Sequence, residues 1–170
     1  MRALFIGQAP SKETDGLEPF VGRCGKFLAA LMGLTHEEML EQHDFINIFD
    51  SWPGAGTGGD LFSINEAKRK ACELLPLLNG RLVIFLGSNV AHAFELNKFS
   101  FFRFYQLLAL SQGSSTTAAV AVVPHPSGVN RWYNDHNNRE AASRFLLSLQ
   151  KRCREMQNFF RKGEIGRGSS

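Results

Sequence analysis

The chain has 170 residues, of which 44% are hydrophobic and 21% charged, with a net charge of +3. These values are typical of one globular domain with an ordinary core. No apolar stretch approaches the roughly 20 residues of a membrane-spanning helix, and the first six residues do not form a signal peptide. We therefore expect an intracellular protein that makes no contact with membranes.

The first half of the chain alternates strand and helix patterns. Apolar runs predict strands over residues 2–6 and 45–49, and apolar periodicity predicts a helix over 24–34. Thr35 and Glu38 have the spacing of a capping box, which begins a short helix over 36–42. Proline and glycine predict loops between these elements, over residues 7–22 and 51–59.

The second half continues the alternation. Ser63 and Glu66 form a second capping-box pattern, for a helix over 64–78. Residues 99–110 are apolar and aromatic, which fits either a helix or an irregular strand. The remaining elements are strands over 82–87 and 118–123 and helices over 88–96 and 139–160. Four apolar strands between helices predict an α/β fold, a three-layer αβα sandwich around a four-stranded, mainly parallel sheet.

The carboxyl-terminal segment is basic. Between Arg139 and Arg167, eight basic side chains face three acidic ones. Such a segment either contacts phosphates or forms a solvated helix face. We assign residues 1–160 to the domain and 161–170 to a flexible basic tail.

Two polar loops follow predicted strands near opposite ends of the chain. The first carries Gly7-Gln8-Ala9-Pro10 and then Pro19-Phe20-Val21-Gly22, and the second carries Pro124-His125-Pro126-Ser127. If their strands are parallel, both loops emerge at the carboxyl edge of the sheet, where open α/β folds bind ligands. A glutamine, a phenylalanine and a histidine would then line one pocket.

The residues of these loops resemble the motifs of the uracil-DNA glycosylase superfamily, most closely its family-four type. The first loop is similar to the first motif, Asn47 lies on a strand like the family's asparagine-bearing strand, and His125-Pro126-Ser127 is similar to the second motif. The matches occur in the family's order over roughly residues 1–150. The resemblance implies a DNA glycosylase-like domain that partners single- or double-stranded DNA as a monomer.

The chain departs from the family-four pattern at two points. Gln8 stands where that family has a glutamate implicated in catalysis. Family-four members also hold an iron–sulfur cluster with four cysteines, but this chain has only the widely spaced Cys24, Cys72 and Cys153. We expect reduced thiols, no cluster, no metal and no other cofactor.

The resemblance implies a base-binding set. Phe20 is the platform on which an extruded base would stack, and the alternative is a core phenylalanine. The Asn47 amide offers the donor and acceptor that read a pyrimidine edge, and the alternative is a structural hydrogen bond. Gly7 and Ala9 complete this set.

Three residues are candidates for catalysis by resemblance. His125, between two prolines, would direct a donor at the base carbonyl, where negative charge develops; the alternative is a structural loop histidine. Gln8 can position a water but cannot take its proton. Asp15, ranked above Glu13, would assist as a carboxylate, unless both are solvated loop charges.

The segment after the histidine is expected to contact DNA. The superfamily uses this region as a wedge into the base stack, and here it offers an arginine and flat rings. An aromatic loop packed against the domain is the alternative. The predicted DNA-binding residues are Ser51, Ser127, Gly128, Asn130, Arg131 and Trp132.

The sequence therefore predicts a glycosylase that flips and excises uracil or a related altered base, leaving an abasic site. Because Gln8 is neutral, a nucleic-acid-binding module without turnover is an alternative. A glycosylase that acts on another modified base is a second alternative.

Overall fold

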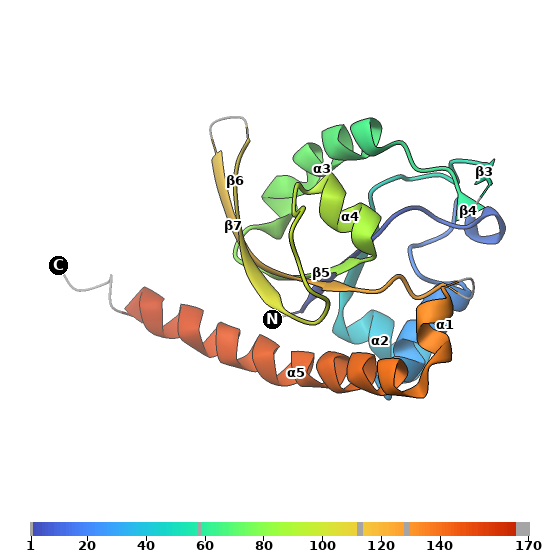
Figure 1. Cartoon of the computed structure of the whole chain (residues 1–170). Coiled ribbons are helices and arrows are strands. Elements are labelled where there is room, and N and C mark those ends of the chain that lie inside the picture. The colour runs from blue at the N-terminus through green and yellow to red at the C-terminus, as the bar shows by residue number, and fades with distance from the viewer. Residues whose placement is uncertain (1, 58, 112–113, 128–129, 166–170) are drawn as a thin grey trace.

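The computed structural model describes residues 2–57, 59–111, 114–127 and 130–165. Its centre is a five-stranded sheet in the order β2-β1-β5-β7-β6 (Figure 1). The first four strands of that order are parallel, and β6 is antiparallel to β7. The strands are β1 (Leu4–Gly7), β2 (Asp44–Asn47), β5 (Leu82–Leu86), β6 (Phe104–Ser111) and β7 (Ser114–Val123).

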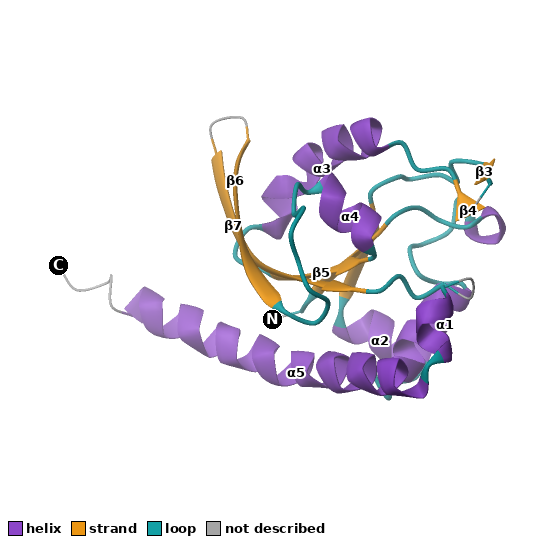
Figure 2. Ribbon diagram, viewed as in Figure 1, coloured by secondary structure: helices purple, strands orange, loops and turns teal. Residues whose placement is uncertain are grey.

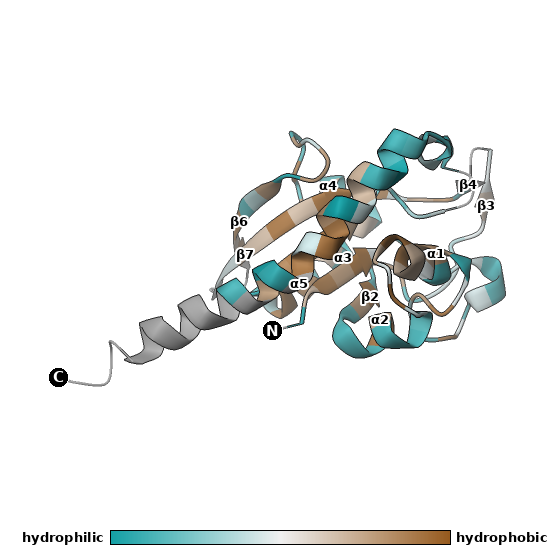
Figure 3. Cartoon of the chain, turned by 90° about the horizontal axis from the view of Figure 1, so that it is seen from below, coloured by the Kyte–Doolittle hydropathy of each residue, from teal (hydrophilic) through white to brown (hydrophobic). Residues whose placement is uncertain are grey.

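Helices cover both faces of this sheet, so the predicted α/β sandwich is confirmed (Figure 2). On one face, residues of α1 (Arg23–Leu31), α2 (His36–Gln42) and α5 (His136–Ile165) share a buried cluster with Phe5 and Ile84. On the other face lie α3 (Ile64–Leu78) and α4 (Ser88–Ala93). Figure 3 shows the apolar strands beneath helices that carry hydrophilic residues. None of the described helices is long and apolar enough to cross a membrane.

The sheet has one more strand than the four predicted. The added strand, β6, comes from the ambiguous segment 99–110 and pairs with β7 from Phe104 to Ser111. A strand with one exposed face normally alternates apolar and polar residues, but here the exposed positions are also apolar. Leu108 and Leu110 point into solvent with exposed fractions of 69% and 86%, so the sequence showed no alternation. A second sheet, β3 (Ala55–Gly56) with β4 (Gly59–Asp60), lies in the predicted glycine-rich loop.

Local signals predicted the middle helices well. In the capping box of α2, Glu38 N donates to Thr35 Oγ1 over 3.1 Å, and Thr35 N donates to Glu38 Oε2 over 2.8 Å. Helix α3 has the predicted bounds, but within the described residues the Ser63 side chain makes no capping hydrogen bond. The Ser63–Glu66 box was therefore wrong, although the helix begins where it was placed.

The ends of two other helices differ from the prediction. Helix α4 stops at Ala93 rather than near residue 96, and Glu95 adopts a φ of 60° just beyond it. Helix α5 begins at His136 and continues to Ile165, so the predicted domain boundary at residue 160 falls within it. The flexible tail stays a prediction, and residues 166–170 lie outside the described residues.

Candidate active site

The predicted loops begin side by side at the carboxyl edge of the sheet. Gly7 at the end of β1 is in register with Asn47 at the end of β2, and Leu86 of β5 is in register with Val123 of β7. Gly87 N continues this pairing by donating to Val123 O over 2.8 Å. Parallel strands therefore bring the loops to one edge, as the sequence predicted.

Phe20 and Asn47 converge on Gly7. A Cβ atom placed on Gly7 would lie 2.4 Å from Asn47 Oδ1 and 2.6 Å from Phe20 Cζ. These distances are far too short for a real side chain, so glycine lets both side chains approach the backbone. The Phe20 ring also contacts Phe45, with ring centroids 5.4 Å apart. The structure thus brings together three members of the predicted base-binding set; the fourth, Ala9, packs against the core on the other face of the sheet.

The backbone of Phe20 is held in an unusual conformation. Its φ is 64°, in the left-handed region that bulky residues rarely adopt. His36 Nε2 lies 2.7 Å from Phe20 O, and a Cβ on Gly25 would lie only 1.7 Å from the same oxygen. Contacts from α1 and α2 therefore fix the strained turn. Sequence reasoning missed His36, since nothing local links it to a loop 16 residues earlier.

Gln8 and His125 approach each other at Gly87. A Cβ on Gly87, whose φ is 104°, would lie 3.1 Å from His125 Cβ and 3.5 Å from Gln8 Nε2. Both side chains therefore pack against the start of α4. Asn89 in this helix donates through Nδ2 to Gln8 Oε1 over 3.3 Å.

Two side chains hold the turn that carries His125. Tyr133 donates its hydroxyl proton to Pro124 O over 2.8 Å, and Asn130 Nδ2 donates to His125 O over the same distance. Burial lowers the pKa of His125, and the negative charge of Asp60 opposes part of that shift. The imidazole is thus neutral at pH 7 and keeps one N–H for donation.

The loop after His125 packs against the domain. The Trp132 ring lies 5.0 Å from Tyr133 and 5.7 Å from Phe102 between ring centroids, and Asn130 Oδ1 accepts from Trp132 N. Asn130 and Trp132 thus have structural contacts, and their DNA contacts stay predictions. The DNA contacts of Arg131 and Ser51, which are exposed, and of Ser127, which is half-buried, also stay predictions. Gly128 lies outside the described residues.

Trp52 joins the first loop to the glycine-rich loop. Its backbone N–H donates to Asp15 Oδ1 over 2.8 Å, and its indole Nε1–H donates to Asp60 Oδ1 over 2.9 Å. Among the described residues, no hydrogen bond joins Asp15 to Gln8 or His125. Asp15 therefore has a loop-bridging contact that the sequence did not predict, and its catalytic role stays a prediction.

The described parts of the chain contain no group of three His, Cys, Asp or Glu side chains that could hold a metal ion. Cys24 is half-buried, Cys72 is exposed and Cys153 is buried. Three cysteines cannot supply the four thiolates that an iron–sulfur cluster of this kind needs.

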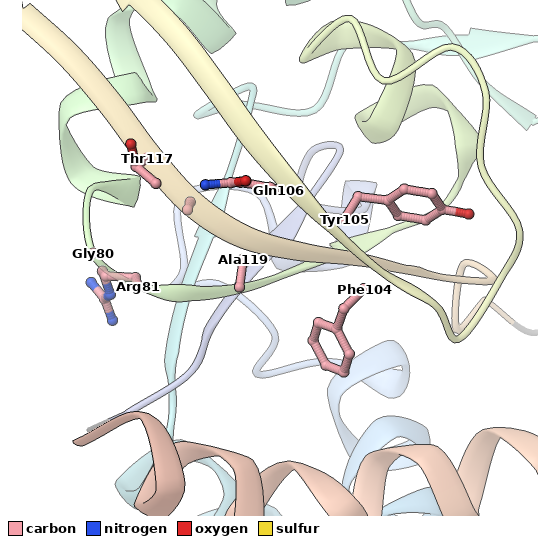
Figure 4. Close-up of a pocket in the computed structure, with 8 residues that line it drawn as sticks. Gly80, Arg81, Phe104, Tyr105, Gln106, Thr117 and Ala119 are labelled. Atoms are coloured by element: carbon pink, nitrogen blue, oxygen red, sulfur yellow. The ribbon is translucent and has the colours of Figure 1, made fainter. Parts of the chain in front are cut away.

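An open groove of about 400 Å³ lies away from these loops (Figure 4). Phe104, Gln106 and Ala119 line it together with Arg81, which directly precedes β5. Because Arg81 marks the amino end of β5, the groove is at the opposite end of the parallel strands from His125.

Comparison with known proteins gives the family. A search of curated protein sequences found no significant match. The family model described as the uracil DNA glycosylase superfamily matches residues 1–150, which include both loops and every strand. The chain therefore belongs to the uracil DNA glycosylase superfamily.

Proposed function

We propose that this protein is a DNA glycosylase that flips uracil or a related altered base out of DNA and hydrolyses its glycosidic bond. The product is an abasic site, the starting point of base excision repair. One observation carries the proposal: Phe20 and Asn47 meet at Gly7 while Gln8 and His125 meet at Gly87, on neighbouring loops of one sheet edge. Family membership supports a glycosylase-type function that acts on DNA.

Each of the four side chains has a part in this reaction. Phe20 stacks on the extruded base, which returns about 1–3 kcal/mol of the flipping cost. The Asn47 amide, held at the end of β2, pairs with the carbonyl and imide groups of the base. Neutral His125 donates to a base carbonyl as negative charge develops there, and Gln8 positions the attacking water.

The test is release of uracil from a labelled oligonucleotide. The protein is incubated with single-stranded and duplex DNA, and alkali then converts abasic sites into strand breaks. We expect breaks with the wild type and their loss in Asn47→Ala and His125→Ala. A panel of modified bases identifies the preferred lesion, and size-exclusion chromatography tests the expected monomer.

One observation favours a second function, that of a nucleic-acid-binding module. Gln8 is neutral, and its oxygen already accepts from Asn89, so this position supplies no carboxylate. Salt-sensitive DNA binding without release of any base would select this alternative.

A further inference from the structure

The position of the Phe20 ring depends on a backbone conformation that phenylalanine rarely adopts. The φ of Phe20 is 64°, and φ sets the direction in which a side chain leaves the backbone. Here it carries the ring to Gly7, where a Cβ atom would lie 2.6 Å from Phe20 Cζ and 2.9 Å from Phe20 Cε2. A bulky residue keeps such a conformation only when the surrounding structure holds it there. The contacts that hold the Phe20 turn therefore decide where the ring lies.

The carbonyl oxygen of Phe20 receives such a contact. His36 Nε2 lies 2.7 Å from this oxygen, and because a carbonyl oxygen can only accept, Nε2 carries a proton and donates it to the hydrogen bond. Gly25, which is buried in α1, lies against the same atoms. A Cβ placed on Gly25 would lie 1.7 Å from Phe20 O and 2.9 Å from His36 Nε2. The oxygen thus contacts both the backbone of α1 and the imidazole of α2, in a space that a side chain at position 25 would fill.

The helices that supply these contacts are themselves held in place. His36 is the first residue of α2, and the capping box between Thr35 and Glu38 fixes that first turn. Met39 of the same helix is fully buried in the core cluster to which α1 also contributes. Helices α1 and α2 contact each other directly (Figure 1). His36 and Gly25 are therefore held at fixed positions relative to the sheet.

We propose that His36 is a positioning residue of the active site, whose hydrogen bond to Phe20 O holds the Phe20 ring where an extruded base stacks on it. This inference rests on the proposed function. His36 acts through Phe20 rather than on the base. Without the donor, the turn can relax toward a conformation that phenylalanine prefers, and the ring leaves Gly7 and Asn47. Base release then slows because stacking is lost, although the other side chains of the site are unchanged.

The experiment compares single-turnover release of uracil from a uracil-containing oligonucleotide by His36→Ala, His36→Gln and the wild type. Alanine removes the donor, so the rate should fall about 5-fold, the effect of one ordinary hydrogen bond. The glutamine amide can donate from nearly the same place as Nε2, so His36→Gln should keep most of the wild-type rate. His92→Ala is the matched control, because His92 is also half-buried but contacts Phe99 instead. It should keep the wild-type rate.

A double-mutant cycle separates positioning from a general effect on the fold. Once Phe20→Ala has removed the ring, the hydrogen bond from His36 has no platform to hold. His36→Ala should therefore cause no further slowing in the Phe20→Ala background. A general loss of structure would instead slow both backgrounds by the same factor. Thermal unfolding of every variant, measured in parallel, ensures that folded proteins are compared.

NMR tests the position of the ring without any catalytic readout. The close approach of Phe20 Cζ to Gly7 predicts nuclear Overhauser contacts between the ring protons and the Gly7 α-protons in the wild type. These contacts should be lost in His36→Ala and kept in His36→Gln.

The outcomes are distinguishable. The role of His36 is overturned, and the glycosylase left intact, by any of three results: a His36→Ala variant as fast as the wild type, equal slowing in both backgrounds of the cycle, or ring contacts that persist in His36→Ala. A wild type that releases no base from any oligonucleotide rejects the proposed function. The ring contacts then decide alone whether His36 holds Phe20: their loss in His36→Ala supports it, and their persistence rejects it.

Discussion

The side-chain amide of Asn89 donates to Gln8 Oε1 over 3.3 Å, which holds the Gln8 side chain against the start of α4. A glutamate at position 8 would offer Asn89 the same acceptor. We therefore expect Gln8→Glu to fold normally and to raise the rate of base release at least ~10-fold, because a carboxylate also takes a proton from water. Single-turnover kinetics on a uracil oligonucleotide measure this, and a fall or no change would remove Gln8 from handling the water.

Phe20→Ala should reduce uracil release at least ~10-fold, because the loss of stacking on an extruded base costs at least ~1.4 kcal/mol. Phe99→Ala is a suitable control, since Phe99 contacts His92 and Phe101 on another part of the domain. Rates and thermal stability are measured together, so that unfolding is not mistaken for lost stacking. Equal rates for Phe20→Ala and the wild type would exclude Phe20 as the platform.

Tyr133→Phe should both destabilise the fold and slow catalysis. The hydroxyl is buried and donates to Pro124 O over 2.8 Å, so its removal leaves that carbonyl without this donor and costs about 1–3 kcal/mol. The turn carrying His125 loses one of the two side-chain hydrogen bonds that hold it, which should also lower the rate of base release. Urea unfolding and single-turnover kinetics measure the two effects.

Tyr105→Phe is the matched control for this variant. Its hydroxyl accepts from Ser100 N at an exposed position, where water can replace it. We expect a change within about 0.5 kcal/mol. An equal loss of stability in both variants would contradict the special role of Tyr133.

His43 should make the fold sensitive to acid. This histidine is buried beside Phe5, both its ring nitrogens lack hydrogen-bond partners among the described residues, and burial, with a smaller contribution from Arg2, lowers its pKa from 6.5 to about 4. The unfolded chain therefore binds a proton more readily than the folded one. Stability is unaffected above the unfolded pKa and falls as the pH drops from about 6.5 to about 4, by up to about 3 kcal/mol.

His43→Phe tests this dependence. The substitution keeps an aromatic ring in the core and removes the titrating group, so the loss of stability over that pH range should shrink. Urea unfolding at neutral and mildly acidic pH measures it. The same pH dependence in the variant and the wild type would assign the acid sensitivity to other groups.

Much of the candidate site was predictable because its residues lie at the ends of strands. Gly7, Gln8 and His125 lie within two residues of the end of an apolar run, and parallel pairing brings such positions to one edge of the sheet. The hydrogen bonds that hold these loops in place were not predictable. His36 of α2 lies within hydrogen-bond distance of Phe20 O, and Asn89 donates to Gln8, which is 81 positions away in the sequence.

The sequence by itself determined the alternation of strands and helices, the capping box at Thr35 and the two loops that carry the candidate site residues, because apolar periodicity and capping act between near neighbours. Tertiary structure alone decided that the ambiguous segment 99–110 contains an edge strand, that Asn130 and Tyr133 hold the His125 turn, and that Trp52 joins Asp15 to Asp60. These contacts join residues that are not linked by any local sequence pattern, so only the packing of the whole chain determines them.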